Sequence, residues 1–299
     1  MERFTDLGRP REGIFWMVLS GLSFVTVNGV VRYLGTDLPV AQSAFLRFAF
    51  GVMFLLPVLP KLFRTKLPAQ ALRLFGWRGL MHSAAVLFWF YAMVRIPVAQ
   101  VTAIGYLNPV LMILASAAFF GEALPLRKLL AVGVALLGAL VVLRPGVQVL
   151  TLGHFSQIAA SICFCGSYLF AKRLSGLVSA SQVVAVLSLT VTAGLAPLAW
   201  WVWVPVTGAQ LGWLALVALG ATSGHYCMTR AFKAAPIAVT QPVTFLQLVW
   251  ASLLGALVFH EAVDGFVLLG GAMIIAAISW VSWRDATEAA RAGRAGHGV

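Results

Sequence analysis

Residues 92–123 have the sequence AMVRIPVAQVTAIGYLNPVLMILASAAFFGEA, and residues 231–262 have the related sequence AFKAAPIAVTQPVTFLQLVWASLLGALVFHEA. The two stretches align without a gap at a shift of 139 residues, which pairs Pro97 with Pro236 and Glu122 with Glu261. Each copy is an apolar run that opens with a proline and closes with a single glutamate. Because a repeat of this length determines the architecture, we interpret the chain as two fused half-copies.

The composition is that of a membrane protein. The chain is 61% hydrophobic and 10% charged, whereas about 25% of the residues of a soluble domain are charged. A soluble helical globule would need polar helix faces, and the apolar runs have none. Each run is about 20 residues long, enough to cross ~30 Å of hydrocarbon as a helix. We expect an all-α membrane protein with ten transmembrane helices, near residues 14–34, 40–60, 76–95, 97–119, 127–144, 153–172, 181–204, 209–229, 236–258 and 264–283.

The segments outside these runs carry fewer signals. Residues 61–75 are basic and look amphipathic, so we expect them to lie at the membrane interface. The tail, residues 285–299, is rich in Ala and Gly, and we expect it to be disordered. The N-terminus lacks a cleavage site for a signal peptide, so the first run is a retained span. The cysteines Cys163, Cys165 and Cys227 all lie in apolar runs, and we expect no disulfide, no metal site and no cofactor.

The net charge of +12 is explained by where the Lys and Arg residues lie relative to the membrane. If the N-terminus is cytoplasmic, nearly all Lys and Arg residues fall on the cytoplasmic side, and only Arg32, Arg95 and Arg144 on the other. Positive residues mark the cytoplasmic side of membrane proteins. The pattern predicts a multi-pass membrane protein of ten spans with both termini cytoplasmic. It argues against nucleic acid as a partner, and leaves the lipid bilayer and a small molecule.

The number of spans predicts an inverted repeat. Five spans per half is odd, so the second half must enter the membrane in the opposite orientation. The first parts of the halves also match, at a shift of 140 residues that pairs Phe24 with Phe164 and Arg32 with Lys172. Inverted repeats are typical of secondary transporters, whose solute site lies near the midplane between the repeats. This geometry is the main functional evidence in the sequence.

The repeated motif also carries a resemblance to a known family. The pattern Ala-x4-Pro-x-Ala at residues 92–99 and 231–238, closed by Glu122 and Glu261, resembles the EamA repeat of the drug/metabolite transporter superfamily. So does Arg47 in the sequence FLRF. The resemblance covers residues 14–145 and 153–284, which we take as the two repeats, and is closest to bacterial amino-acid exporters of the YddG type. It implies ten helices around a central cavity and export of amino acids or other metabolites.

The acidic residues argue against proton coupling. No predicted span carries a carboxylate at mid-depth, whereas proton-coupled export of lipophilic cations commonly needs one. The small multidrug members of the superfamily have a Glu in the first span, and this chain has none there. Glu122 and Glu261 lie at helix ends, where we favour a structural role over a direct mechanistic one. The sequence therefore predicts facilitative transport.

Arg47 is the one strongly charged residue inside a predicted span. A buried arginine is costly unless it is paired or reaches the interface. It could bind a carboxylate of the substrate, or it could tie helix ends together by donating to carbonyls. We favour the structural role, because the family resemblance implies that the second span packs outside the cavity.

The uncharged polar residues of the spans are the candidate substrate-binding residues. Asn108 and Gln247 are related by the repeat, and His82 and His225 each lie about one turn inside the cytoplasmic face. Any one of them could instead form a helix–helix hydrogen bond. Together they predict an uncharged cavity with aromatic walls, which suits zwitterions. The full set is Asn28, His82, Trp89, Tyr106, Asn108, Tyr168, His225, Tyr226 and Gln247.

Prolines and glycines indicate how the helices bend and pack. Pro109 and Pro242 interrupt the fourth and ninth spans and permit kinks. The two prolines sit at different depths of their repeats, so any gating motion at them would be asymmetric. A group of glycines near the repeat ends allows close helix approach; these are Gly133, Gly138, Gly255, Gly270 and Gly271.

Other functions fit the sequence less well. A membrane enzyme would need a nucleophile, metal ligands or an acid–base pair at one depth, and only His82 and His225 are available. A channel or receptor would not require inverted halves. We therefore expect an exporter of amino acids or related metabolites that works by alternating access, with nucleosides or small drugs as the alternative solutes. The sequence does not decide the oligomeric state, and a monomer is the simplest expectation.

Overall fold

The structure is a computed structural model that describes residues 10–57, 59–62, 64, 67–121, 124–235, 240 and 242–295. These ranges form helices and no β-sheet. The first repeat contains α1 (Pro10–Leu34), α2 (Val40–Leu55), α3 (Leu59–Leu62), α4 (Ala69–Met93), α5 (Val98–Gly105), α6 (Leu107–Phe120) and α7 (Leu126–Leu143). The second contains α8 (Leu152–Ser175), α9 (Ala180–Trp201), α10 (Gly208–Ala234), η1 (Pro242–Thr244), α12 (Phe245–Phe259) and α13 (Gly265–Ala295).

The helices differ in how apolar they are. Five described segments are long and apolar enough to cross a membrane: Pro10–Leu34, Val98–Phe119, Leu126–Leu143, Gln182–Trp201 and Gly265–Glu288. Helices α2 and α12 are apolar but shorter. Helices α4, α8 and α10 have 25, 24 and 27 residues, which is long enough to span at 1.5 Å per residue. Polar side chains lower their hydropathy, and these three helices carry most of the candidate site.

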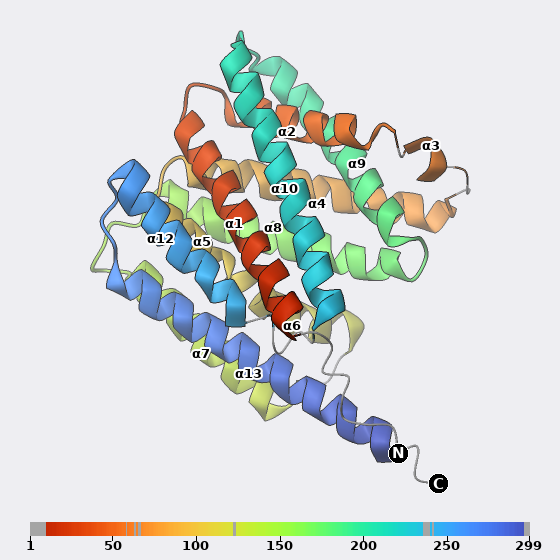
Figure 1. The fold of residues 1–299 in the computed structure, drawn as a ribbon, viewed down its shortest axis with the longest axis vertical. Coiled ribbons are helices and arrows are strands. Elements are labelled where there is room, and N and C mark those ends of the chain that lie inside the picture. Colours follow the sequence, from red (N-terminus) through yellow and green to blue (C-terminus); the bar gives the residue numbers. More distant parts are fainter. Residues whose placement is uncertain are drawn as a thin grey trace.

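The two repeats pack as an inverted pair. The most extensive helix packings are α1 with α10, α4 with α8, α7 with α13 and α2 with α9. Since α1 corresponds to α8 and α4 to α10, the first two are one packing made twice. The other two join equivalent helices across the pseudo-two-fold axis. In Figure 1 the turn after α1 lies on the left and the turn after α8 on the right, so these equivalent helices run in opposite directions.

The fourth and ninth spans are broken at matching positions. Helix α5 ends at Gly105 and α6 begins at Leu107, while η1 precedes α12, which begins at Phe245. Pro109 therefore falls in the first turn of α6, where its missing N–H is not needed. The hydroxyl of Tyr106 donates to the carbonyl of Thr244 at 2.9 Å, which joins the two breaks. The prolines lie at or beside these breaks, since η1 begins at Pro242 and Pro109 lies in the first turn of α6, and asymmetric gating at them stays a prediction.

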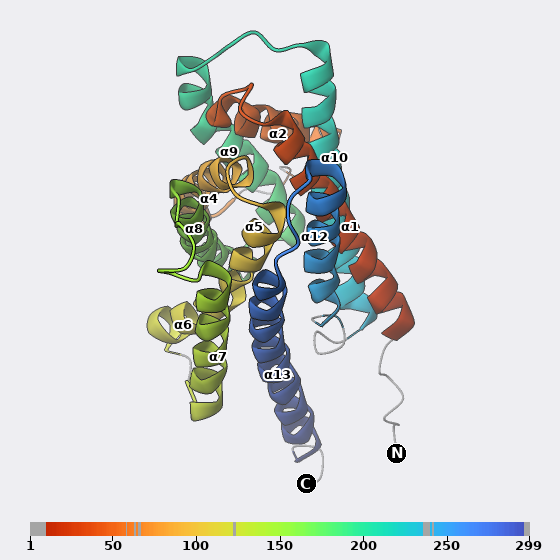
Figure 2. The same ribbon diagram turned by 90° about the vertical axis from the view of Figure 1, so that its left-hand side faces the viewer.

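Glycine permits close packing between α7 and α13, which run side by side in Figure 2. A Cβ added to Gly138 would lie 2.7 Å from the carbonyl oxygen of Gly270, and a Cβ on Gly270 would strike the carbonyl of Gly138. Gly133 has open space around it. Close approach is thus confirmed for Gly138 and Gly270 but not for Gly133.

Two segments differ from the sequence-based expectation. Helix α4 begins at Ala69 rather than near residue 76, because Ala71 and Phe75 are buried against the ends of α8 and α9. Helix α13 continues to Ala295 instead of giving way to a disordered tail at residue 285. Arg127 of α7 forms ion pairs with Asp285 and Glu288, which hold that extension against α7. Glu122, Pro236 and residues 296–299 lie outside the described residues.

Candidate functional site

Two histidine–phenylalanine pairs lie at equivalent places in the two repeats. The ring of His82 on α4 meets Phe164 on α8 edge-on, with centroids 5.1 Å apart. The ring of His225 on α10 meets Phe24 on α1 in the same way, also at 5.1 Å. Phe24 and Phe164 are the residues that the shift of 140 pairs. The pairs therefore flank the pseudo-two-fold axis, and His82 lies near the middle of α4 rather than one turn from its end.

The surroundings of His82 are aromatic. Its Nδ1 lies 3.1 Å from the hydroxyl of Ser167, and the ring of Phe48 on α2 meets it edge-on at 5.9 Å. Phe164 also stacks on Tyr168, with centroids 6.1 Å apart and an interplanar angle of 15°. Helices α2, α4 and α8 thus supply a continuous group of rings around one imidazole.

Arg47 belongs to this group. Its guanidinium carbon lies 4.2 Å from the ring centroid of Phe48, and Arg47 is within electrostatic reach of both His82 and His225. Helix α2 packs against α4, α9 and α10. Helix α2 also lies against its equivalent α9 on the axis, and the position of the second span outside the cavity stays a prediction.

Three amide side chains lie near the helix breaks. The Asn108 Oδ1 is buried and has no hydrogen-bond partner among the described residues. The Gln157 Oε1 on α8 is in the same state, and its Nε2 lies beside Gly105, at 3.6 Å from where a Cβ would stand. Gln247 packs against Gly21 of α1, since a Cβ on Gly21 would be 3.6 Å from the Cβ of Gln247. The sequence analysis missed Gln157, whose repeat equivalent is the apolar Met17.

Three other predicted residues make contacts typical of packing. The Asn28 side chain donates to the hydroxyl of Thr102 at 3.4 Å, joining α1 to α5. Trp89 is half-buried and meets Phe90 edge-on at 5.1 Å. The hydroxyl of Tyr106 donates the hydrogen bond that joins the two helix breaks.

Tyr226 lies apart from the other predicted residues. It is 56% exposed, and its hydroxyl accepts a hydrogen bond from Arg230 at 3.1 Å. Arg230 also lies 3.5 Å from Glu12 and stacks on Trp16. These residues form an interfacial cluster at the ends of α1 and α10. Neighbouring residues on a helix differ by about 100° in direction, so Tyr226 does not share the direction of His225.

One end of the molecule is closed by polar contacts between the repeats. Arg32 at the end of α1 lies 2.8 Å from Glu261, which follows α12. The other carboxylate oxygen of Glu261 accepts from the backbone N–H of Val98 at 3.0 Å. Arg32 also donates to the carbonyl of Met93 at 3.2 Å. The ends of α1, α4, α5 and α12 are therefore held together at this face, which we call the Arg32 face.

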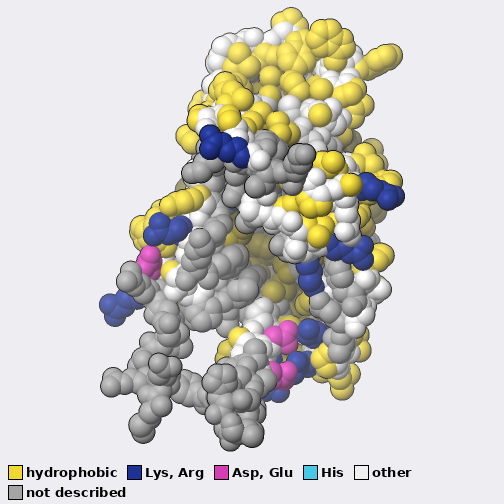
Figure 3. All heavy atoms as spheres, turned by 90° about the vertical axis from the view of Figure 1, so that its right-hand side faces the viewer, with side chains coloured by type: hydrophobic (Ala, Val, Ile, Leu, Met, Phe, Trp, Pro, Cys, Tyr) yellow, Lys and Arg dark blue, Asp and Glu magenta, His cyan; other side chains and the backbone are white. Residues whose placement is uncertain are grey.

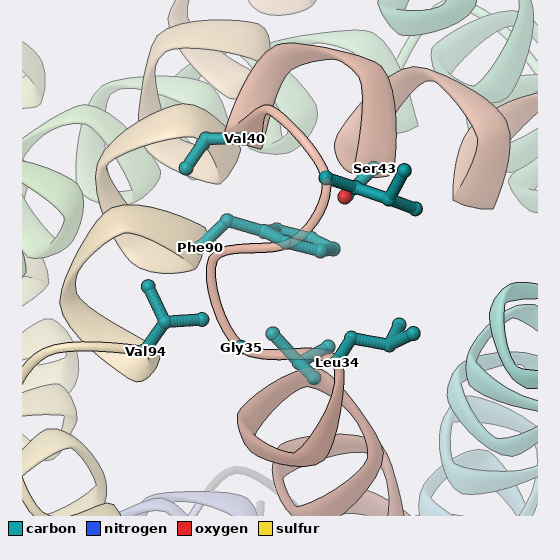
Figure 4. Close-up of a pocket in the computed structure, with 8 residues that line it drawn as sticks. Leu34, Gly35, Val40, Ser43, Phe90 and Val94 are labelled. Carbon is teal, nitrogen blue, oxygen red and sulfur yellow. The ribbon is translucent and has the colours of Figure 1, made fainter. Parts of the chain in front are cut away.

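Two further contacts lie at the same face. The side-chain amide of Gln42 donates to the carbonyl of Val204 at 2.8 Å and accepts from its N–H at 3.0 Å. Arg144 at the end of α7 pairs with Asp264 at the start of α13. A small pocket, with room for about one water molecule, remains beside the turn after α1, lined by apolar side chains and Ser43 (Figure 4). It lies two turns beyond Phe24 along α1, on the closed side of the histidine pairs.

The opposite face is hollowed. Figure 3 shows a recess near its middle with hydrophobic side chains inside, and Lys and Arg side chains spread over the surface around it. The histidine pairs thus lie between a closed face and a recessed one. This arrangement is typical of a transporter in one of its two alternating conformations.

Comparison with known proteins decides the family. Residues 11–144 and residues 151–283 each match the EamA-like transporter family. The chain belongs to the EamA-like transporter family. A riboflavin transporter of Rhizobium johnstonii is 30% identical over 282 residues, 91% of each chain. The pseudopaline exporter CntI of Pseudomonas aeruginosa is 26% identical, over 89% of this chain and 94% of its own.

Other relatives and a solved structure agree with this assignment. An S-adenosylmethionine uptake transporter of Rickettsia felis is 25% identical over 90% of this chain and 92% of its own. A solved crystal structure matches with a TM-score of 0.57 over 91% of this chain and 96% of that one. Its 21% identity supports the fold alone. This EamA-like protein is thus a membrane transporter of small metabolites, and not an enzyme.

Proposed function

We propose that this EamA-like protein exports amino acids or related small metabolites from the cytoplasm by alternating access. The observation that carries the proposal is the pair of equivalent His–Phe contacts at 5.1 Å on either side of the pseudo-two-fold axis. A solute between them would meet both repeats at once. A rocking motion of one repeat against the other would then expose it to either face.

The orientation in the membrane is part of the proposal. The recessed face, around which Lys and Arg gather (Figure 3), would be cytoplasmic, because positive residues accumulate there. Both termini would lie on that side of the inner membrane, and the Arg32 face would be outside. The two repeats would be residues 14–145 and 153–284, with the contacts of Arg32 closing the outer side.

The proposed site is uncharged apart from Arg47. His82, His225, Tyr168, Asn108 and Gln247 offer donors and acceptors for both groups of a zwitterion, and Phe24 and Phe164 would cover its side chain. Asn28, Trp89 and Tyr106 would support the helices that hold the site. The described carboxylates other than that of Asp37 form ion pairs with Arg or Lys side chains, and Asp37 lies in the turn after α1. The transport would therefore follow the solute gradient.

A second solute class has a specific observation in its favour. The 30% identical relative is a riboflavin transporter, and the rings of Phe24, Phe48, Phe164 and Tyr168 would stack on a flavin or a nucleoside base. Amino acids remain the first choice, because the polar groups on both sides of the axis suit a zwitterion.

Purified protein in liposomes would test the proposal. Uptake of labelled amino acids, riboflavin and a nucleoside would be measured with and without an imposed pH gradient. Saturable uptake of one or more amino acids, unchanged by the gradient, is expected. Uptake of riboflavin or the nucleoside alone would move the assignment to the second class. Accumulation driven by protons would show that the facilitative mechanism is wrong.

A further inference from the structure

We propose that Arg47 binds an anionic group of the transported solute, and that this group is a carboxylate. The proposal rests on the proposed function, since it places the solute between His82 and His225. The proposal also adds to the proposed function, because it names a chemical group, the carboxylate, that every well-transported solute must carry. The zwitterionic amino acids would satisfy it, whereas riboflavin, which has no carboxylate, would not.

The state of the Arg47 guanidinium is the first observation. Its Nε is buried without a hydrogen-bond partner, and no described residue accepts from its terminal nitrogens. The ring of Phe48, 4.2 Å away, offers only a cation–π contact, which compensates a buried cation in part. A charge held at this depth normally needs a paired anion. Among the described residues Arg47 therefore has no hydrogen-bond acceptor and no paired anion.

The acidic residues that the structure describes leave this charge uncompensated. Those in the described ranges are Glu12, Asp37, Glu261, Asp264, Asp285 and Glu288. All except Asp37 form ion pairs with basic residues other than Arg47. Asp37 lies in the turn after α1, three turns of chain away from Arg47. The counter-ion of Arg47 must then come from outside the described chain.

A comparison with Arg78 separates this role from a structural one. Arg78 lies one turn before His82 on α4 and is also buried. Its Nη1 donates to the carbonyl of Val183 at 2.7 Å and so ties α4 to α9. Arg47 makes no such bond within the described residues. The repeat equivalent of Arg47 is Leu187, so one half alone supplies the charge on the axis.

The surroundings suit a carboxylate. Arg47 and Arg78 lie within electrostatic reach of His82, and Arg47 within that of His225, so both histidines have cationic neighbours. A guanidinium binds a carboxylate through two parallel hydrogen bonds. The rings of Phe48, Phe164 and Phe24 would cover the apolar remainder of the solute.

The test compares ligands that differ in the acid group alone. The stabilisation of the purified protein by phenylacetate, phenylacetamide and phenyl phosphate would be measured by thermal shift, separately from amino-acid uptake in liposomes. The variants are Arg47→Met, Arg47→Lys and the control Arg95→Met. Arg95 is exposed at the Arg32 face and stacks on Tyr91 at 3.7 Å. Like Arg47 it makes a cation–π contact, but it lies away from the histidine pairs.

Phenylacetate should stabilise the wild-type protein and phenylacetamide should not. Arg47→Met should weaken phenylacetate binding tenfold to a hundredfold, about 1.4–2.8 kcal/mol, with Arg47→Lys intermediate and Arg95→Met unchanged. Equal binding of acid and amide by the wild type would overturn the proposal even if Arg47→Met does not fold. Tenfold tighter binding of phenyl phosphate would overturn the choice of a carboxylate. Carboxylate binding at Arg47 without amino-acid uptake would contradict the proposed function alone.

Discussion

Glu261→Gln is the sharpest perturbation of the closed face. The substitution removes the negative charge that lies 2.8 Å from Arg32. It keeps the shape of the side chain and an oxygen that can accept from Val98 N–H, now at 3.0 Å. Arg32 retains its bond to the carbonyl of Met93. The change therefore isolates the ion pair between α1 and the end of α12.

The structure sets the size of the effect. The side chains of Arg32 and Glu261 are 21% and 11% exposed, between a surface pair worth about 0–1 kcal/mol and a buried pair whose disruption costs about 3–5 kcal/mol. The paired oxygen of Glu261 has no aligned hydrogen bond, which favours the lower part of that range. We expect a loss of about 1–2 kcal/mol, a factor of roughly 5–30 in the population of the closed state.

Labelling of a buried cysteine would measure this shift. Ser43 is buried and lines the pocket of Figure 4, so Ser43→Cys should react slowly with a bulky charged maleimide. The native cysteines Cys163, Cys165 and Cys227 would first be replaced by alanine. In this background Glu261→Gln should raise the labelling rate roughly 5- to 30-fold, because reaction follows the open population.

Asp264→Asn provides a matched control on the same turn. Asp264 pairs with Arg144, and this contact joins α7 to α13, which stay packed across the axis. The control should lower the melting temperature and leave the labelling rate unchanged. An unchanged rate in Glu261→Gln, or an equal rise in both variants, would refute the role of the Arg32–Glu261 pair as the closure.

The remaining predictions concern packing, the site and topology. Gly270→Ala should lower the melting temperature, because its Cβ would strike the carbonyl of Gly138 and overpacking costs about 1–3 kcal/mol; Gly133→Ala, in open space, should be neutral. Asn108→Ala and Gln247→Ala should weaken solute affinity several-fold to about a hundredfold in uptake assays with folded protein; normal affinity in both would place the site elsewhere. Reporter fusions should give a cytoplasmic signal after Lys128, Arg173 and Arg291 and an external signal after Asp37, Pro145 and Thr207; a cytoplasmic signal at Thr207 would exclude ten spans.

Much of the fold follows from the repeat in the sequence. The shift that pairs Phe24 with Phe164 requires equivalent packings, and the two His–Phe contacts are the result. The start of α4 was not predictable from hydropathy, because Ala71 and Phe75 are buried by α8 and α9, which are far away in the chain. The match between the two helix breaks was also missed, since η1 begins at Pro242 whereas α5 ends at Gly105, before Pro109.

The kinds of residue in the candidate site were easier to predict from the sequence than the individual residues. Polarity selected His82, His225 and Asn108 as candidate residues. Periodicity could not show that the Tyr226 side chain contacts Arg230 and points away from the direction of His225. Gln157 was missed because its repeat equivalent is apolar. Arg47 was assigned to a structural role, because only the packing of α2 on α4, α9 and α10 brings it near both histidines.

Alternating access at a site between the repeats is the central claim, and counterflow tests it most directly. Liposomes that contain the purified protein would be loaded with an unlabelled amino acid, and the entry of the labelled form would be followed. The account predicts a saturable entry that speeds up several-fold with internal solute and is indifferent to a pH gradient. An entry that rises linearly with concentration and ignores the internal solute would contradict it.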